Sequence, residues 1–96
     1  MTLLEKVRLH REEILRLAAE HGAYNVRLFG SVVRGEEGPE SDVDLLILME
    51  RGRSLYDWVR LEAAISELLA CPVDVSIETE AVTEGQRQIL REAVVL

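Results

Sequence analysis

The segment from Phe29 to Leu46 decides how this chain is interpreted, and it reads Phe-Gly-Ser-Val-Val-Arg-Gly-Glu-Glu-Gly-Pro-Glu-Ser-Asp-Val-Asp-Leu-Leu. Its two aspartates, Asp42 and Asp44, stand at the head of an apolar run. Because side chains at i and i+2 of a strand point to the same face, the two carboxylates are expected to project together. Like charges at this spacing raise the pKa of at least one carboxyl group, and a bound divalent cation removes that cost. Mg²⁺ is typically held by one or two carboxylates and substrate phosphates, so the pair is a candidate metal site.

A Gly-Ser pair, Gly30-Ser31, ends the preceding apolar run and supplies a second candidate site. A glycine allows the backbone to approach a ligand closely. Ser31 is expected to cap a short helix that ends at Arg34, and to offer its hydroxyl and free N–H groups to an anion. The sequence therefore predicts a phosphate-binding turn close to the candidate metal site.

The spacing of these residues is more specific than either pair alone. The string is Gly-Ser, two residues, Arg-Gly, five residues, Ser-Asp, one residue and Asp-Leu. It resembles the signature of the DNA polymerase β-like nucleotidyltransferase superfamily, and its short spacing is most similar to the minimal nucleotidyltransferase (MNT) family. The resemblance covers nearly the whole chain. One departure is Val33, where the family often has alanine, and this change bears on the packing of the turn and leaves the ligands intact.

Length and composition indicate a small globular protein. The 96 residues fit one domain, 1–96, with 48% apolar residues. No apolar run reaches the length of a membrane span. The first residues lack the basic head and apolar run of a signal peptide, and a single cysteine, Cys71, suits a reducing compartment. We expect a cytoplasmic protein with no membrane contact.

The charge balance limits the partners. Eighteen acidic residues face eleven basic ones, which gives a net charge of −7. Nonspecific binding of nucleic acid depends on neutralising phosphates with Lys and Arg, and the sequence has no basic stripe. Direct binding to nucleic acid is therefore not expected, whereas a protein, above all a basic one, or a small molecule suits this composition.

Hydrophobic periodicity and turn residues predict an α+β fold. We expect a small twisted mixed sheet of about three strands with helices packed on it, and the resemblance implies that this is the polymerase β-like nucleotidyltransferase core. Within the first strand, Tyr24, Val26 and Leu28 are expected to share one face. Trp58 follows the apolar stripe of its helix, so core packing is a better interpretation than base stacking. The expected helices cover residues 3–20, 55–70 and 86–96, and the expected strands cover residues 24–29, 42–49 and 73–77.

Asp74 alternates with apolar residues in the last expected strand. From composition alone it is either an ordinary solvent-facing residue or a third carboxylate that joins Asp42 and Asp44 from a neighbouring strand. In the superfamily that this chain resembles, a third acidic residue stands on such a strand after the intervening helix. The resemblance therefore identifies Asp74 as the candidate third member of the site.

The resemblance implies a role for each candidate residue. Asp42 and Asp44 would hold one or two Mg²⁺ ions that bridge the triphosphate of ATP, and Asp74 would complete the second metal position and help deprotonate the attacking hydroxyl. Gly30 and Ser31 would bind the β or γ phosphate. Arg34 would neutralise the negative charge that develops during the reaction. The alternative is that Arg34 is an ordinary surface residue in a loop.

The resemblance also implies a partner. MNT proteins are typically paired with a HEPN-domain protein, a small helical RNase, in toxin-antitoxin modules. This chain would then be the antitoxin that transfers AMP from ATP to a tyrosine of the toxin. Two alternatives remain open: an antitoxin that neutralises the toxin by binding alone, and an enzyme that modifies a small molecule in a pocket made by dimerisation. The apolar tail, residues 94–96, either docks on the core or contacts a partner in a homo- or hetero-oligomer.

Overall fold

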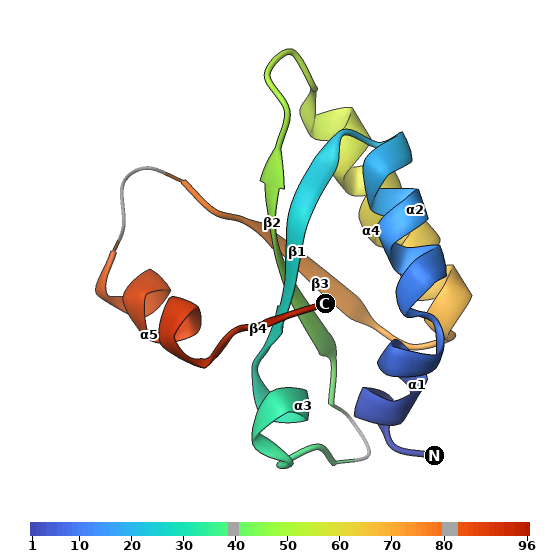
Figure 1. Ribbon diagram of the computed structural model, residues 1–96, viewed down its shortest axis with the longest axis vertical. Helices are drawn as coiled ribbons and strands as arrows, with labels where there is room; N and C mark the ends of the chain where they lie inside the picture. The colour runs from blue at the N-terminus through green and yellow to red at the C-terminus, as the bar shows by residue number, and fades with distance from the viewer. Residues whose placement is uncertain (39–40, 80–82) are drawn as a thin grey trace.

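The computed structural model describes residues 1–38, 41–79 and 83–96. Within these residues the strands form one four-stranded sheet of order β3-β2-β1-β4 (Figure 1). The strands are β1 (Ala23–Phe29), β2 (Val43–Met49), β3 (Val73–Ile77) and β4 (Val94–Val95). β1 runs antiparallel to both β2 and β4, whereas β2 and β3 are parallel. The predicted mixed sheet is therefore confirmed, and β4 adds one strand to the expected three.

Helices cover the sheet unequally. There are four longer helices within the described residues: α1 (Leu3–Leu9), α2 (Arg11–Glu20), α4 (Leu55–Leu69) and α5 (Glu84–Glu92). A short helix, α3 (Ser31–Arg34), lies between β1 and β2 in the chain. Figure 1 shows α2 and α4 side by side against one face of the sheet, while α5 lies on the other side of β1. None of the helices within the described residues combines the length and the apolar character that a membrane span needs.

The single helix expected over residues 3–20 is wrong, because the structure ends α1 at Leu9 and begins α2 at Arg11. His10 forms the junction, with φ −101° and ψ 14°. Its Nδ1 lies 2.9 Å from the carbonyl oxygen of Lys6 in the preceding turn. A side chain that enters the hydrogen-bond ladder of a helix is a common cause of a kink.

The hydrophobic core lies between the sheet and the helices α1, α2 and α4. β2 is its central strand, and its apolar residues from Val43 to Ile47 are fully buried. This matches the near-continuous apolar run expected of a strand covered on both faces. Trp58 packs against the core as predicted, and its indole N–H donates to the carbonyl oxygen of Val75 at 2.8 Å. The packed core fixes where β2 and β3 present their polar residues.

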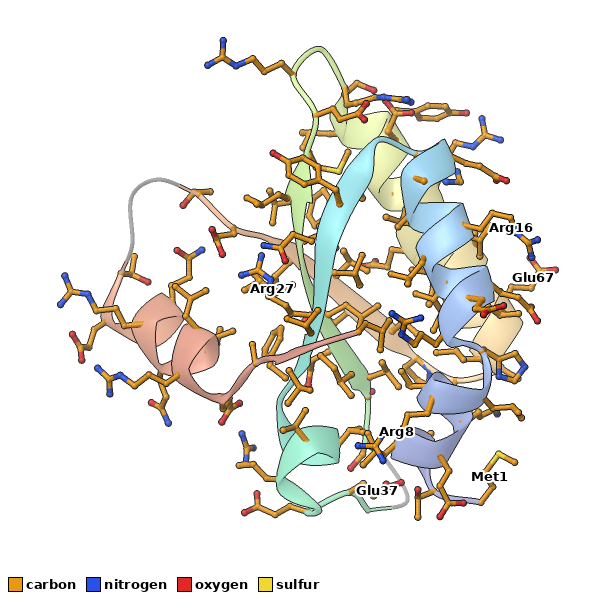
Figure 2. The ribbon with its side chains drawn as sticks, in the orientation of Figure 1. Met1, Arg8, Arg16, Arg27, Glu37 and Glu67 are labelled. Carbon is orange, nitrogen blue, oxygen red and sulfur yellow. The ribbon has the colours of Figure 1, made fainter. Side chains whose placement is uncertain are left out.

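The predicted alternation in β1 is wrong at its start. Tyr24 is 51% exposed, whereas Val26 and Leu28 are buried. Asn25 has φ 50°, and the pairing of β1 with β2 shifts between Tyr24 and Arg27. Such a β-bulge inserts a residue and changes which face the following side chains occupy. Arg27, labelled in Figure 2, is thereby buried in the sheet, where it forms an ion pair with Glu78.

The C-terminal segment also differs from expectation. A helix was expected over residues 86–96, but α5 ends at Glu92 and the chain becomes extended at Ala93, with φ −63° and ψ 137°. Val94 and Val95 then pair with Leu28 and Arg27 of β1. Consecutive β-branched residues favour a strand over a helix. The apolar tail therefore docks on the sheet of its own chain.

Candidate active site

The Gly-Ser turn lies directly against a carboxylate of the neighbouring strand. Gly30 follows β1, and the residue before it, Phe29, pairs with Asp44 of β2. A Cβ atom at Gly30 would collide with Oδ2 of Asp44 and lie 3.1 Å from its Cγ. The backbone also has φ 84°, a conformation that only glycine adopts readily. Conformation and close approach thus both require glycine at this position.

The short helix after the turn is confirmed, with one change in the role of Ser31. The N-cap of α3 is Gly30, whose carbonyl oxygen accepts hydrogen bonds from the N–H groups of Val33 and Arg34 at 3.1 and 3.2 Å. Ser31 is the first residue inside the helix, so the prediction that it caps the helix is wrong. Its side chain remains half-buried beside the turn.

The three aspartates meet at one end of the parallel strand pair. Asp44 and Asp74 are direct register partners on β2 and β3, and Asp42 lies two residues before Asp44, just outside the strand. Register partners on adjacent strands share one face of a sheet. The pKa of Asp44 is raised, first by burial and then by the negative charges of Asp74 and Asp42. The structure therefore brings together the three carboxylates that the sequence singled out.

Metal binding by this group stays a prediction. Among residues 1–38, 41–79 and 83–96, no set of three or more His, Cys, Asp or Glu side chains is arranged closely enough to hold an ion. The chemistry of the donors nevertheless fits Mg²⁺, which takes carboxylate oxygens. Burial first, and then the negative charges of Asp74 and Asp42, raise the pKa of Asp44, and a cation would neutralise these charges. The aspartate side chains would have to converge for coordination.

Arg34 is held beside the turn by two carboxylates. Its Nε donates to Oε2 of Glu36 at 2.9 Å, and its Nη1 donates to Oε1 and Oε2 of Glu92 at 2.9 and 3.1 Å. These two partners, Glu36 first, raise the pKa of the guanidinium group. Oε1 of Glu92 also accepts the backbone N–H of Gly30 at 3.0 Å. Arg34 thus belongs to the same cluster as the Gly-Ser turn.

Sequence reasoning missed Glu92. It is one of 18 acidic residues in the chain, and it lies 58 positions from Arg34 and 62 from Gly30. No motif or periodicity marks it, because its contact with the turn depends on how α5 is placed in space. No signal in the sequence could have distinguished it from the other surface carboxylates.

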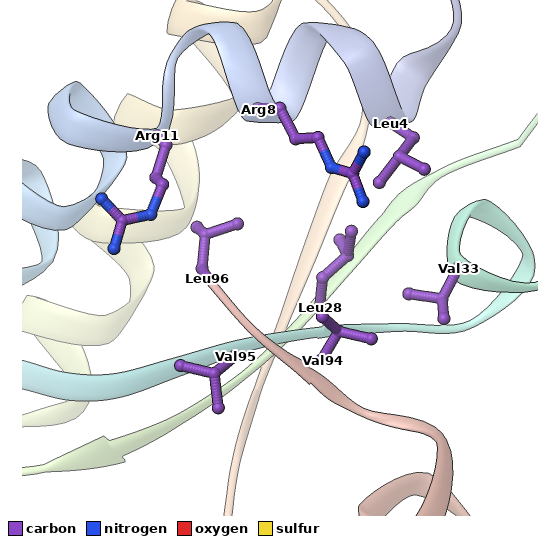
Figure 3. Close-up of a pocket in the computed structure, with 8 residues that line it drawn as sticks. All are labelled: Leu4, Arg8, Arg11, Leu28, Val33, Val94, Val95 and Leu96. Carbon is purple, nitrogen blue, oxygen red and sulfur yellow. The ribbon is translucent and has the colours of Figure 1, made fainter.

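An apolar pocket of about 360 Å³ lies elsewhere, between α1, β1 and β4 (Figure 3). Its lining consists of aliphatic side chains and two arginines: Leu4, Arg8, Arg11, Leu28, Val33, Val94, Val95 and Leu96. Neither the Gly-Ser turn nor any of the three aspartates lines it. The candidate active site is therefore a surface feature at the strand ends, separate from this pocket.

Comparison with known proteins supports the interpretation of the Gly-Ser and aspartate motif as that of a nucleotidyltransferase. The nucleotidyltransferase domain family matches residues 7–96, a range that includes the Gly-Ser turn and all three aspartates. The protein adenylyltransferase MntA of Thermococcus cleftensis is 34% identical over 85 residues, which are 88% of this chain and 83% of that protein. A protein of Methanocaldococcus jannaschii, assigned as a protein adenylyltransferase, is 34% identical over 84 residues, which are 88% of this chain and 90% of that protein.

Solved structures agree with the sequence relatives. One structure, assigned as a minimal nucleotidyltransferase, is 47% identical and superposes with a TM-score of 0.87, covering 100% of this chain and 97% of that chain. A crystal structure of a toxin-antitoxin with AMP-PNP has a TM-score of 0.73 at 21% identity, covering 88% of this chain and 69% of that chain, which shows a shared fold. This chain therefore belongs to the nucleotidyltransferase domain family, among the minimal nucleotidyltransferases, and is an enzyme of nucleotidyl transfer.

Proposed function

We propose that this protein is a metal-dependent adenylyltransferase that transfers AMP from ATP to a tyrosine of a HEPN toxin, and so acts as its antitoxin. The observation that carries the proposal is the juxtaposition of the Gly-Ser turn and the aspartates. The backbone of Gly30 lies against Asp44, which is itself in register with Asp74. A turn that can bind phosphate, beside carboxylates on two neighbouring strands, supplies the two parts that nucleotidyl transfer needs.

The reaction assigns a task to each group. The acceptor oxygen attacks the α phosphorus of ATP, a new P–O bond forms, and the bond between the α phosphorus and the bridging oxygen breaks to release pyrophosphate. The N–H of Gly30 and the hydroxyl of Ser31 bind the leaving phosphates, and Arg34 offsets their charge. The proton of the acceptor hydroxyl passes to the carboxylate of Asp74 and then to water. Mg²⁺, held by Asp42, Asp44 and Asp74, would supply Lewis-acid stabilisation of the phosphates.

The position of the site favours an acceptor carried by a protein. Asp42 and Asp74 are both exposed, so a side chain of another protein can reach them. None of the three aspartates lines the apolar pocket. Two relatives at 34% identity carry the name protein adenylyltransferase, and proteins of the same fold occur in toxin-antitoxin structures. These findings support a toxin as the acceptor.

The test is intact mass spectrometry of the HEPN toxin that we propose as the partner. The toxin is incubated with this protein, ATP and Mg²⁺. We expect it to gain the mass of one or more AMP groups, to lose this gain with Asp42→Asn, and to keep it with Glu67→Gln. Glu67 is an exposed carboxylate on α4, labelled in Figure 2, and its substitution removes one negative charge that does not belong to the candidate site.

Two other results would redirect the assignment. An unmodified toxin that still forms a stable complex would indicate an antitoxin that acts by binding alone. AMP transfer to a small molecule in the absence of any protein partner would indicate a small-molecule nucleotidyltransferase.

A further inference from the structure

The groups expected to bind phosphate are already bonded to a carboxylate of the same chain. Glu92, the last residue of α5, accepts the N–H of Gly30 at 3.0 Å through Oε1. Both of its carboxylate oxygens accept from Nη1 of Arg34, at 2.9 and 3.1 Å. A carboxylate and the edge of a phosphate present the same pattern, namely two oxygens that share negative charge. Glu92 therefore makes the contacts that a nucleotide phosphate would make at this turn.

We propose that Glu92 is an internal competitor of the nucleotide: its carboxylate occupies the phosphate position formed by Gly30 and Arg34, and ATP must displace it to bind. The inference rests on the proposed function, since it assumes that the Gly-Ser turn receives the phosphates of ATP. It assigns a specific residue outside the family motif to the control of substrate binding.

The two occupants exclude one another for physical reasons. The backbone of Gly30 has a single N–H, and that donor is already committed to Glu92. A phosphate placed at the same donors would also lie beside the negative charge of Glu92, and like charges repel strongly where water is partly excluded. The Glu92 side chain is only 22% exposed, so water screens it incompletely. Its charge also contributes to the raised pKa of the neighbouring Asp44.

The placement of α5 allows this competitor to leave. None of the residues of α5 is buried, in contrast to the helices on the opposite face of the sheet. Figure 1 shows α5 standing beside the sheet and followed directly by β4. Displacing the Glu92 side chain, or the last turn of α5 with it, therefore disrupts little packing. Pairing of β4 with β1 retains the rest of the segment.

Nucleotide affinity tests the proposal directly. Binding of Mg²⁺ and the non-hydrolysable analogue AMP-PNP to the full chain is measured by calorimetry for the wild type, Glu92→Gln and Glu84→Gln. Glu84 is an exposed carboxylate at the start of the same helix, so its substitution removes the same charge without touching the turn. We expect Glu92→Gln to bind the analogue about tenfold more tightly than the wild type, and Glu84→Gln to remain within about twofold.

A second measurement follows the release of α5. Hydrogen exchange of the wild type should become faster over residues 84–92 when AMP-PNP is added, because the Glu92 contact is lost. Thermal unfolding of the three proteins serves to establish that each variant is folded.

Each outcome bears on the proposal. Weaker binding by Glu92→Gln would overturn it, because Glu92 would then position Arg34 for the nucleotide. Equal affinity in all three proteins would overturn it as well and would leave the proposed function standing. Binding by Glu92→Gln but not by the wild type would support it in its strongest form. If none of the proteins binds the analogue, the assignment of the Gly-Ser turn as a nucleotide site fails, and both proposals fall together.

Discussion

The two sides of the sheet differ in how firmly they are packed. On one side, α2 and α4 cover β2 with fully buried residues such as Ile14, Leu61 and Ile65. On the other side, α5 has no buried residue and reaches the site through the side chain of Glu92. The strands β2 and β3 are anchored by alternate residues buried under α2 and α4, and Asp44 and Asp74 project from the opposite face of these strands, toward the side of α5. The carboxylates that the chemistry needs at fixed positions are thus carried by firmly packed strands, whereas the group that contacts the phosphate turn is carried by a loosely packed helix. The firmly packed strands therefore hold the reacting groups in place, whereas the loosely packed helix controls the access of the nucleotide to the phosphate turn.

The largest expected effect is on activity when a carboxylate carried by the firmly packed strands is removed. Asp44→Asn should lower the rate of AMP transfer by about 100-fold to 1,000-fold, because Asp44 is the central carboxylate of the site. The same change should not lower the melting temperature, since it removes a charge that burial and its neighbours disfavour. The rate is measured with labelled ATP, with Glu67→Gln as the control. A folded Asp44→Asn variant with full activity would contradict the assignment of the site.

A matched pair of core substitutions tests the difference in packing. Ile65 of α4 is 1% exposed, whereas Ile89 of α5 is only half-buried. Ile65→Ala should lower the free energy of unfolding by about 2–5 kcal/mol, and Ile89→Ala by about 1 kcal/mol or less. Urea unfolding of both variants measures the difference. Equal losses would mean that α5 is packed as firmly as α4 and that the comparison fails.

A matched pair of glycine substitutions examines the turn itself. Gly30 and Gly35 both have positive φ, 84° and 72°, but only Gly30 lies against another side chain. Gly35→Ala should cost about 1 kcal/mol of stability from backbone strain. Gly30→Ala should cost about 2–3 kcal/mol, because the new Cβ also collides with Asp44. Chemical unfolding again provides the measurement, and similar losses for both variants would show that Asp44 moves aside freely.

The smallest expected effect is on pH dependence. The folded-state pKa of Asp44 is raised, so the protonated carboxyl is favoured by folding and the charged form is disfavoured. Its contribution to stability is therefore fully present below the ordinary carboxyl pKa of about 4 and is lost as the pH rises through the folded-state value. The melting temperature of Asp44→Asn should exceed that of the wild type by a margin that grows over this interval. A margin that shrinks as the pH rises would show that the pKa of Asp44 is lowered.

Local patterns predicted the central part of the fold and most of the candidate site. Asp42 and Asp44 stood out because they head a buried apolar strand. Asp74 alternates with apolar residues, but only the resemblance to a known family assigned it to the candidate site. The extent of α4 and β3 followed from helical periodicity and from the Pro72 stop signal.

The missed features depend on single side chains or on distant segments. The break between α1 and α2 falls at His10, whose side chain lies within hydrogen-bond distance of a backbone carbonyl, and the bulge in β1 coincides with the positive φ of Asn25. The contact of Glu92 with the turn and the pairing of β4 with β1 join segments that lie more than 50 positions apart in the chain. Such long-range contacts leave no periodic trace, so a single sequence does not reveal them.

β4 forms one edge of the sheet with only two residues, Val94 and Val95. An edge strand displays unpaired N–H and C=O groups, and a long apolar edge recruits strands of other chains and leads to aggregation. Two residues offer too few such groups to hold another strand in register, although both valines are exposed. Within the described residues this edge therefore offers only a short template for pairing with another strand, and a variant that lengthens β4 with further apolar residues is expected to lose solubility.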